Sequence, residues 1–198
     1  MHGSTVSSAA VAVPVRFGLT AAVFALVASL LVALPAHGAG RAWSAYLAPA
    51  GVCKAAEDPA AALAAQARAI GCLVNWARTQ DRRVKLTQRP ALRRAAALKG
   101  QRVASCGDFS HTPCGSEVTA AVRAAGYRYA SFGENLFAGT WGQVSARDVV
   151  TEWLQSPPHR ANVLQAGFRD VGFAPVRAHG LLGDGDVVVW TATFASPR

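Results

Sequence analysis

Two histidines and a glutamate, from three separate segments, are the residues whose types could do chemistry in this chain. His111 lies between Cys106 and Cys114, Glu134 lies between a glycine and an asparagine, and His159 follows two consecutive prolines. Imidazole and carboxylate groups are common general acids, general bases and metal ligands. Glycine, proline and bridged cysteine set the backbone path around each of them. The sequence therefore predicts one rigid polar site that contains His111, Glu134 and His159.

The order of these segments resembles a known family. The runs CGDFSHTPC at 106–114, GEN at 133–135 and SPPHRAN at 156–162 are similar to motifs of the CAP superfamily. This superfamily comprises the cysteine-rich secretory, antigen 5 and pathogenesis-related proteins, and the similarity is greatest to its bacterial SCP-like members. It extends from about Gly71 to the C-terminus, and the last run is its most specific part. The resemblance implies an α-β-α sandwich, with a small antiparallel sheet between helical layers, in which His111, Glu134 and His159 share a central cleft.

One position departs from the pattern of many eukaryotic relatives. They have a second cleft glutamate shortly after the tryptophan of the preceding helix, whereas this chain has Ser156 in that stretch. Glu152 precedes Trp153 and, at helical spacing, should point elsewhere, so we expect it on the surface. Asn135 and Ser156 are weaker candidates for ligand binding.

Three functions are compatible with such a site. We favour an exported binding or interaction domain that recognises a lipid, an envelope component or a host molecule, the roles that the resemblance implies. The alternative is a hydrolase in which His111 or His159 is a general base or holds a divalent metal such as zinc, with Glu134 orienting it. Against catalysis, the chain has no Gly-x-Ser-x-Gly and no His-Glu-x-x-His motif. The missing acid also predicts weak metal retention, and a third hypothesis gives these residues a purely structural role.

The N-terminal segment indicates export. Arg16 precedes an apolar run at 17–34, and small residues at 36–38 suit a signal peptidase. We assign 1–38 to a signal peptide, 39–57 to a linker or N-terminal extension and 58–198 to the CAP (SCP-like) domain. The run approaches the length of a membrane span, so an uncleaved anchor is the alternative. We expect a protein that is secreted, or anchored to the membrane and facing outward.

Charge narrows the class of partner. The formal net charge is +9, and much of the excess lies between Arg78 and Arg102, where basic residues face only Asp81. The stripe is either a solvated helix face or a dedicated anion-binding surface for a lipid or an anionic envelope component. No aromatic residues are interleaved with it, so we expect no nucleic acid as partner, and membrane contact only through an uncleaved N-terminal segment. We also expect a monomer.

The four cysteines favour two disulfides, because their number is even and the chain carries an export signal. Cys106 and Cys114 are close enough for a local bridge, which leaves Cys53 with Cys72. Sequence alone allows three pairings.

Periodicity and capping signals predict the elements that position the site. Helices are expected at about 58–78, 90–105, 116–125 and 145–156, the last with a near capping box at Ser145 and Asp148. Strands are expected at 132–137, 170–177 and 187–195, the last two forming an antiparallel hairpin. Helices come early and strands late, which favours an α+β fold.

Overall fold

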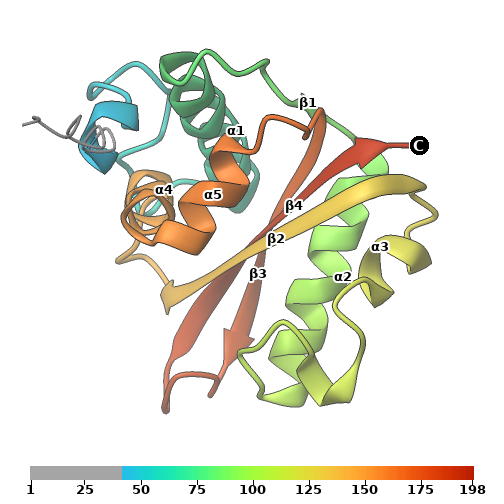
Figure 1. Ribbon diagram of the computed structural model, residues 1–198. Helices are drawn as coiled ribbons and strands as arrows, with labels where there is room; N and C mark the ends of the chain where they lie inside the picture. The colour runs from blue at the N-terminus through green and yellow to red at the C-terminus, as the bar shows by residue number, and fades with distance from the viewer. Residues whose placement is uncertain (1–41) are drawn as a thin grey trace, which may run out of the picture. The chain divides into compact units, whose positions relative to one another are not determined.

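The computed structural model describes residues 42–198. These residues form a three-layer sandwich in which one four-stranded sheet separates two groups of helices (Figure 1). The predicted signal peptide at 1–38 lies outside the described residues.

The sheet has the strand order β1-β3-β4-β2. Its strands are β1 (Thr87–Gln88), β2 (Tyr129–Thr140), β3 (Asp170–His179) and β4 (Asp186–Pro197). β4 pairs antiparallel with both β2 and β3, which confirms the predicted hairpin. The short β1 escaped sequence analysis and runs parallel to β3, so the sheet is mixed rather than purely antiparallel. β2 is an edge strand, and it carries Glu134.

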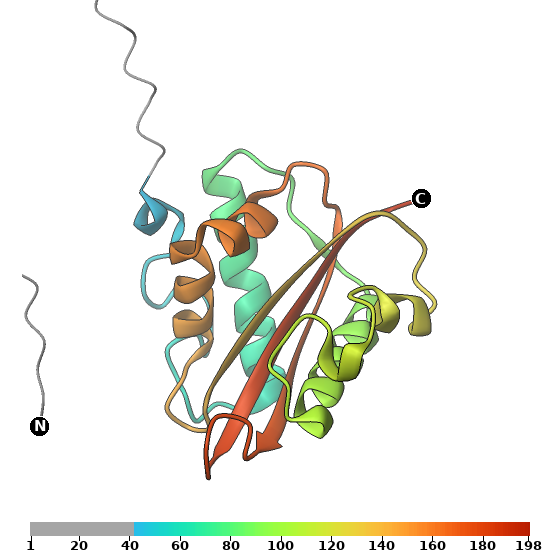
Figure 2. The ribbon, with the colours of Figure 1, turned by 60° about the horizontal axis from the view of Figure 1, so that its bottom comes forward.

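The helices cover both faces of this sheet, as Figure 2 shows from below. On one face lie α1 (Leu63–Gln80), α4 (Ala146–Gln155) and α5 (Pro157–Leu164), and on the other lie α2 (Pro90–Cys106) and α3 (Ala120–Ala124). The larger hydrophobic cluster lies under the first group and includes Trp153, Trp190 and Phe194, each at most 1% exposed. Burial of such aromatic side chains is the main stabilising contribution to the sandwich.

Two predicted helices are confirmed almost to the residue. α2 starts with Pro90 at its first position, where the missing N–H is no loss, and Gly107 ends it in the left-handed region at φ 61°. α4 has the complete capping box between Ser145 and Asp148. Strong local signals therefore fixed these ends.

The other helix ends differ from the prediction. The helix expected from Asp58 starts only at Leu63, because the Asp58 carboxylate accepts a hydrogen bond from the Ala60 N–H and forms a local turn instead. The helix expected from Ser116 is reduced to the short α3. The prolines at 157 and 158 do end α4, but they also begin α5, an element that sequence analysis missed.

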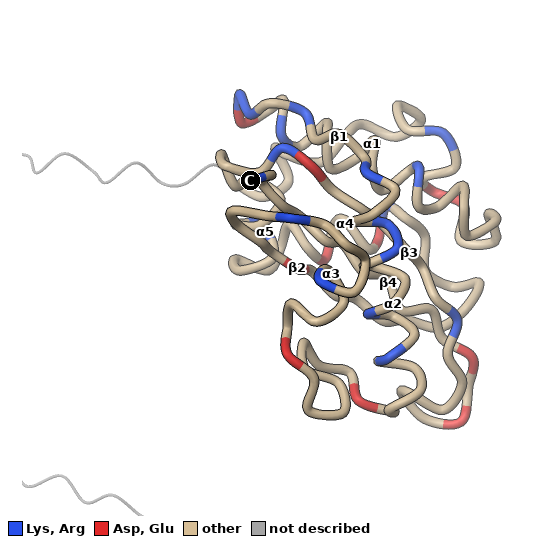
Figure 3. The backbone as a smooth tube through the Cα atoms, turned by 90° about the vertical axis from the view of Figure 1, so that its right-hand side faces the viewer, with Lys and Arg blue, Asp and Glu red and all other residues tan. Residues whose placement is uncertain are grey.

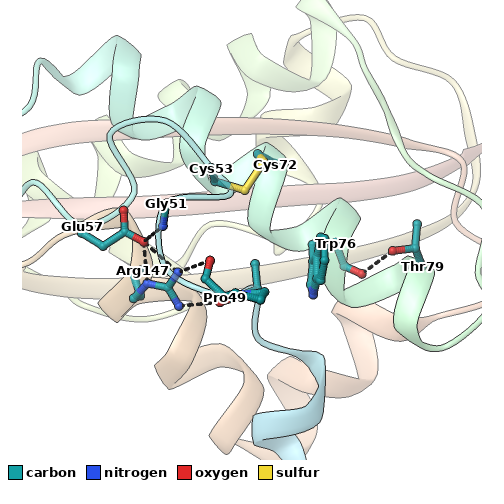
Figure 4. Close-up of a disulfide and its surroundings, with 9 residues drawn as sticks. Pro49, Gly51, Cys53, Glu57, Cys72, Trp76, Thr79 and Arg147 are labelled. Atoms are coloured by element: carbon teal, nitrogen blue, oxygen red, sulfur yellow. Dashed lines mark hydrogen bonds and ion pairs between the residues drawn. A yellow bond between two sulfur atoms is a disulfide. The ribbon is translucent and has the colours of Figure 1, made fainter.

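The segment before α1 packs against the helices. A 3-10 helix (η1, Trp43–Tyr46) belongs to the main core, and the Cys53–Cys72 bridge ties the segment to α1 (Figure 4). Arg147 of α4 binds the Glu57 carboxylate at 2.7 Å and the Pro49 carbonyl at 3.1 Å. The predicted disulfide is confirmed, and the residues assigned to a linker or extension at 39–57 are, from 42 onward, in contact with the domain.

Arg78 is the buried cation that holds α5 to α1. Its guanidinium donates to the carbonyls of Val84, Val163, Gln165 and Phe168 at 2.8–3.2 Å, and the residue is 0% exposed. Burial lowers the pKa of Arg78 to about 10, and the nearby positive charges act in the same direction. Arg78 therefore does not belong to a solvated basic face.

No helix among residues 42–198 is both long and apolar enough to cross a bilayer.

Replacing Arg78 with leucine should lower the free energy of unfolding by about 3 kcal/mol, because buried carbonyls lose their charged donor. Chemical denaturation followed by circular dichroism measures this change. Arg68→Leu on the exposed side of α1 is the matched control and should change the value by less than about 0.5 kcal/mol. Equal losses in the two variants would contradict the assigned role of Arg78.

Candidate functional site

Glu134 is the centre of the site. It lies on β2, which places its side chain toward α2, and that side chain is only 3% exposed. Its Oε1 atom accepts from Lys99 Nζ at 3.2 Å and contacts His111 Nδ1 at 2.8 Å. A buried carboxylate requires such partners, because it has lost its hydration. The histidine partner expected for Glu134 is present as His111, and Lys99 is an additional partner.

Lys99 approaches Glu134 from α2. Its side chain is 1% exposed, and Nζ also donates to the carbonyls of His111 at 2.5 Å and Val118 at 3.4 Å. All three ammonium hydrogens therefore have acceptors within reach. Lys99 belongs to the basic stripe in sequence, but the structure removes it from any solvated face. It fixes the backbone of the histidine loop as well as the glutamate.

The loop that carries His111 is closed by the Cys106–Cys114 bridge, which confirms the second predicted disulfide. A short 3-10 helix (η2, Pro113–Gly115) follows the histidine, and Pro113 is buried. The imidazole itself is 47% exposed. A covalent link and a buried proline thus hold a ring that is open to solvent.

Asn135 and Asn162 connect β2 to α5. The Asn135 amide donates to the His159 carbonyl at 3.0 Å, and the Asn162 amide donates to the Glu134 carbonyl at 3.2 Å and to Asn135 Oδ1 at 2.9 Å. Gly133 allows this approach, because a Cβ there would lie 2.8 Å from Asn162 Oδ1. Since Asn135 is 0% exposed, its amide serves to position α5 against β2.

His159 is the third residue of α5 and is partly buried. Burial lowers its pKa, and the positive charge of a protonated His111 lowers it further. His159 is therefore predominantly neutral at pH 7.

The structure joins His111 to Glu134, and the bond from Asn135, the next residue on β2, places the backbone of His159 beside them. A His111 Nδ1–H that donates to the Glu134 carboxylate leaves Nε2 as a free acceptor, an arrangement that fixes both the tautomer and the ring orientation. Within residues 42–198, neither Nε2 of His111 nor the ring of His159 has a hydrogen-bond partner. These ring nitrogens are the groups that remain available to a ligand.

Comparison with known proteins agrees with this motif arrangement. A sequence profile of the CAP family, the cysteine-rich secretory proteins, matches residues 72–194 and so includes all three site residues. The chain belongs to this family. No curated protein matches the chain.

Solved structures of bacterial CAP proteins share the fold. An extracellular protein containing an SCP domain from Bacillus anthracis aligns with a TM-score of 0.56 and 19% identity over 66% of this chain. An outer surface protein from Borrelia burgdorferi aligns with a TM-score of 0.58 and 14% identity, over 67% of this chain and 93% of its own chain. A cysteine-rich secretory protein from Staphylococcus aureus aligns with a TM-score of 0.53 and 14% identity over 71% of this chain. The alignments span only 40% and 39% of the Bacillus and Staphylococcus chains.

The donor set of this CAP domain does not fit a catalytic zinc ion. Such an ion takes three protein ligands and an open position, whereas Oε1 of Glu134 is already bound to Lys99 and His111. Two imidazoles remain, and residues 42–198 contain no group of three or more metal-ligating side chains.

Two further residues of the last motif differ in role. Arg160 donates to the Leu154 carbonyl at 2.6 Å and so satisfies the end of α4. Ser156 is partly buried at the junction of α4 and α5, and its side chain makes no capping bond. Glu152 is exposed, as its helical position predicted.

Sequence reasoning missed Lys99 as part of this site. Asn162 belongs to the most specific motif, where its amide is expected to be a hydrogen-bond donor, and the structure shows it donating to Glu134 and Asn135. Lys99 gave no such signal, because a lysine among arginines on an amphipathic helix normally points to solvent. Only its distance to Glu134 assigns its role.

Removing both members of the buried ion pair should cost less than the sum of the two single removals. Lys99→Met and Glu134→Leu should each lower the free energy of unfolding by about 3 kcal/mol, because each leaves an uncompensated buried charge. The double variant leaves none and should lose less than the sum of the two. Denaturant unfolding of the four proteins measures this coupling, and simple additivity would show that the pair is not energetically linked.

Acid should weaken the fold through His159. The pKa of His159 is lower in the folded state than in the unfolded chain, so below about pH 6.5 the unfolded chain binds more protons. The free energy of unfolding therefore decreases as the pH is lowered from about 6.5 to the pKa of the folded state. His159→Gln should remove this part of the pH dependence. NMR titration should show the pKa of His159 rising toward about 6.5 in His111→Gln but not in His179→Gln, a distant control. An unchanged pKa in His111→Gln would mean that the two rings do not interact.

Proposed function

We propose that this CAP domain is an exported binding module whose recognition centre consists of His111, Glu134 and His159. The observation that carries the proposal is the buried network in which Lys99 holds Glu134, and Glu134 in turn holds the exposed ring of His111. A binding group must keep its geometry before the ligand arrives, because ordering it later reduces affinity. The network and the Cys106–Cys114 bridge provide this order.

The chemistry of the ring nitrogens points to a hydroxyl-bearing ligand. A neutral imidazole presents one donor and one acceptor, and a hydroxyl group can satisfy either. The polar part of an envelope component, such as a glycan or a lipid head group, supplies several hydroxyls in a small space. Such a ligand could bind both His111 and His159 without a net charge.

The contacts of the site support binding over nucleophilic catalysis. A serine, threonine or cysteine nucleophile needs a base within hydrogen-bond reach. Within residues 42–198, no hydroxyl or thiol bonds to either imidazole, and Ser110 instead accepts from the Thr112 N–H. A general-base reaction with water is the second candidate, because the His111–Glu134 pair has the geometry of an oriented base.

Export is supported by two observations. The sequence predicts a signal peptide at 1–38, and both disulfides of the domain are of the kind that persists outside the cytosol. Two proteins of similar fold are described as extracellular and as an outer surface protein. We propose the same location for this protein.

Native mass spectrometry of protein purified from its own host should reveal a co-purifying molecule. We expect this molecule to be lost from His111→Gln and from His159→Gln, because each variant removes one ring from the pair. His179→Gln is the matched control, since His179 is exposed on the β3–β4 hairpin and paired with Asp186 at 2.9 Å. Circular dichroism checks that each variant is folded.

Two results would contradict the proposal. Retention of the molecule by both His111→Gln and His159→Gln would place its site elsewhere. Conversion of the molecule by the wild-type protein at a rate that His111→Gln abolishes would assign a general-base enzyme instead.

A further inference from the structure

A groove lies at the sheet edge opposite the histidine site. β1 pairs only with Asp170 and Val171 at the start of β3, and within residues 42–198 no other strand lies along this edge. The groove, of about 460 Å³, occupies the gap between α1 and α2, over Phe173 and Pro175 of β3. The two helices cover opposite faces of the sheet (Figure 1), so the open edge separates them.

The groove is lined by small apolar side chains and by arginines. Ala64 and Ala67 of α1 and Ala97 of α2 line the groove, together with Arg68 and Arg93. Within residues 42–198, the side chains of these two arginines make no hydrogen bond or ion pair. Their charges are therefore available to a ligand.

The groove continues into three neighbouring depressions that share its basic residues. Arg68 also lines one with Lys54, Arg93 lines one with Arg89, and Arg94 lines one on the far side. In the part of the chain that the structure describes, no aspartate or glutamate lines any of the four. Figure 3 shows basic segments beside α1, β3 and α2 on this side of the molecule. The charged residues that line these depressions are therefore all basic.

Not every one of these cations is equally available. Arg89 is held by the buried Asp170 carboxylate at 2.9 Å, so its charge is largely compensated. Arg94 donates to the Ala125 carbonyl at 3.3 Å and keeps its net charge. The uncompensated charges are those of Lys54, Arg68, Arg93 and Arg94, which come from three different segments.

We propose that this groove binds a linear polyanion, a polymer with phosphate groups spaced along its chain. A single anion could use only one or two of these cations, whereas an extended polymer can contact those of α1 and α2 together. The attraction is electrostatic, and each contact adds to the affinity and to its salt dependence. The positive end of the α2 dipole, in its first turn beside Arg93, acts in the same direction.

The groove is poorly suited to two other extended ligands. A peptide added as a strand needs N–H donors along β3, but Pro175 has none, and Gly172 is covered so closely that a Cβ there would lie 2.1 Å from the α2 backbone at Arg93. A nucleic acid would gain from base stacking. Phe173 is the aromatic residue that lines the groove, and at 3% exposure it offers no stacking face.

Fluorescence anisotropy with labelled inorganic polyphosphate of about 15 phosphates tests the proposal, with oligothymidylate of equal charge and inorganic phosphate as competitors. The Arg68→Gln/Arg93→Gln double variant should weaken polyphosphate binding about tenfold or more, since two charged contacts are lost. The slope of log affinity against log salt should become shallower by roughly one per arginine removed. Arg102→Gln/Arg128→Gln is the control, because it lowers the net charge equally at exposed positions outside the groove.

Three outcomes would overturn the inference. Equal weakening in the control variant would mean that net charge alone attracts the polymer. Competition by inorganic phosphate at similar phosphate concentration would reduce the groove to a single-anion site. Tighter binding of oligothymidylate would assign a nucleic acid instead. His111→Gln should leave polyphosphate binding unchanged, so this test is independent of the histidine site.

Discussion

The site of this CAP domain depends on the ion pair between Lys99 and Glu134 in a place that water does not reach. Taking a carboxylate and an ammonium group out of water is costly, and the cost is offset only when each has several partners. Here Glu134 has Lys99 and His111, and Lys99 has two carbonyls in addition. The same bonds that compensate the buried charges fix the histidine loop, so the ion pair and the position of His111 cannot be separated.

The other half of the site is fixed by bonds to the backbone. His159 is carried by α5, a short helix that begins with two prolines and has little apolar surface of its own. Asn135 holds its first turn to β2, and Arg78 holds the carbonyls at its end to α1. The Asn135 amide and the Arg78 guanidinium bind backbone carbonyls and not side chains. The ring of His159 therefore takes no part in holding α5 and remains free for a ligand. The bonds that hold α5 in place thus use backbone carbonyls, and the proposed recognition uses the side-chain ring of His159.

The two edges of the sheet serve different purposes. β2, at one edge, presents Glu134 to α2 and Asn135 to α5, which is possible because successive side chains of a strand point to opposite faces. At the other edge, β1 ends after two residues and leaves the rest of that side of β3 unpaired, while β4 pairs with its other side. Edge strands commonly carry proline or charged neighbours that prevent pairing with another chain. Pro175 and the arginines above it meet that requirement, and the same charges form the basic groove.

The sequence by itself determined what depends on neighbouring residues. Pro90, Gly107 and the capping box of Ser145 set the limits of α2 and α4, and the local bridge around His111 followed from its spacing. The motif order also indicated the fold and the three site residues, although their roles remain predictions. Only the tertiary structure decided which basic residues are buried. Arg78 and Lys99 look like their exposed neighbours in the chain, because a cation's partner can lie far away in sequence, and only the folded distances show whether water or a buried acceptor meets it.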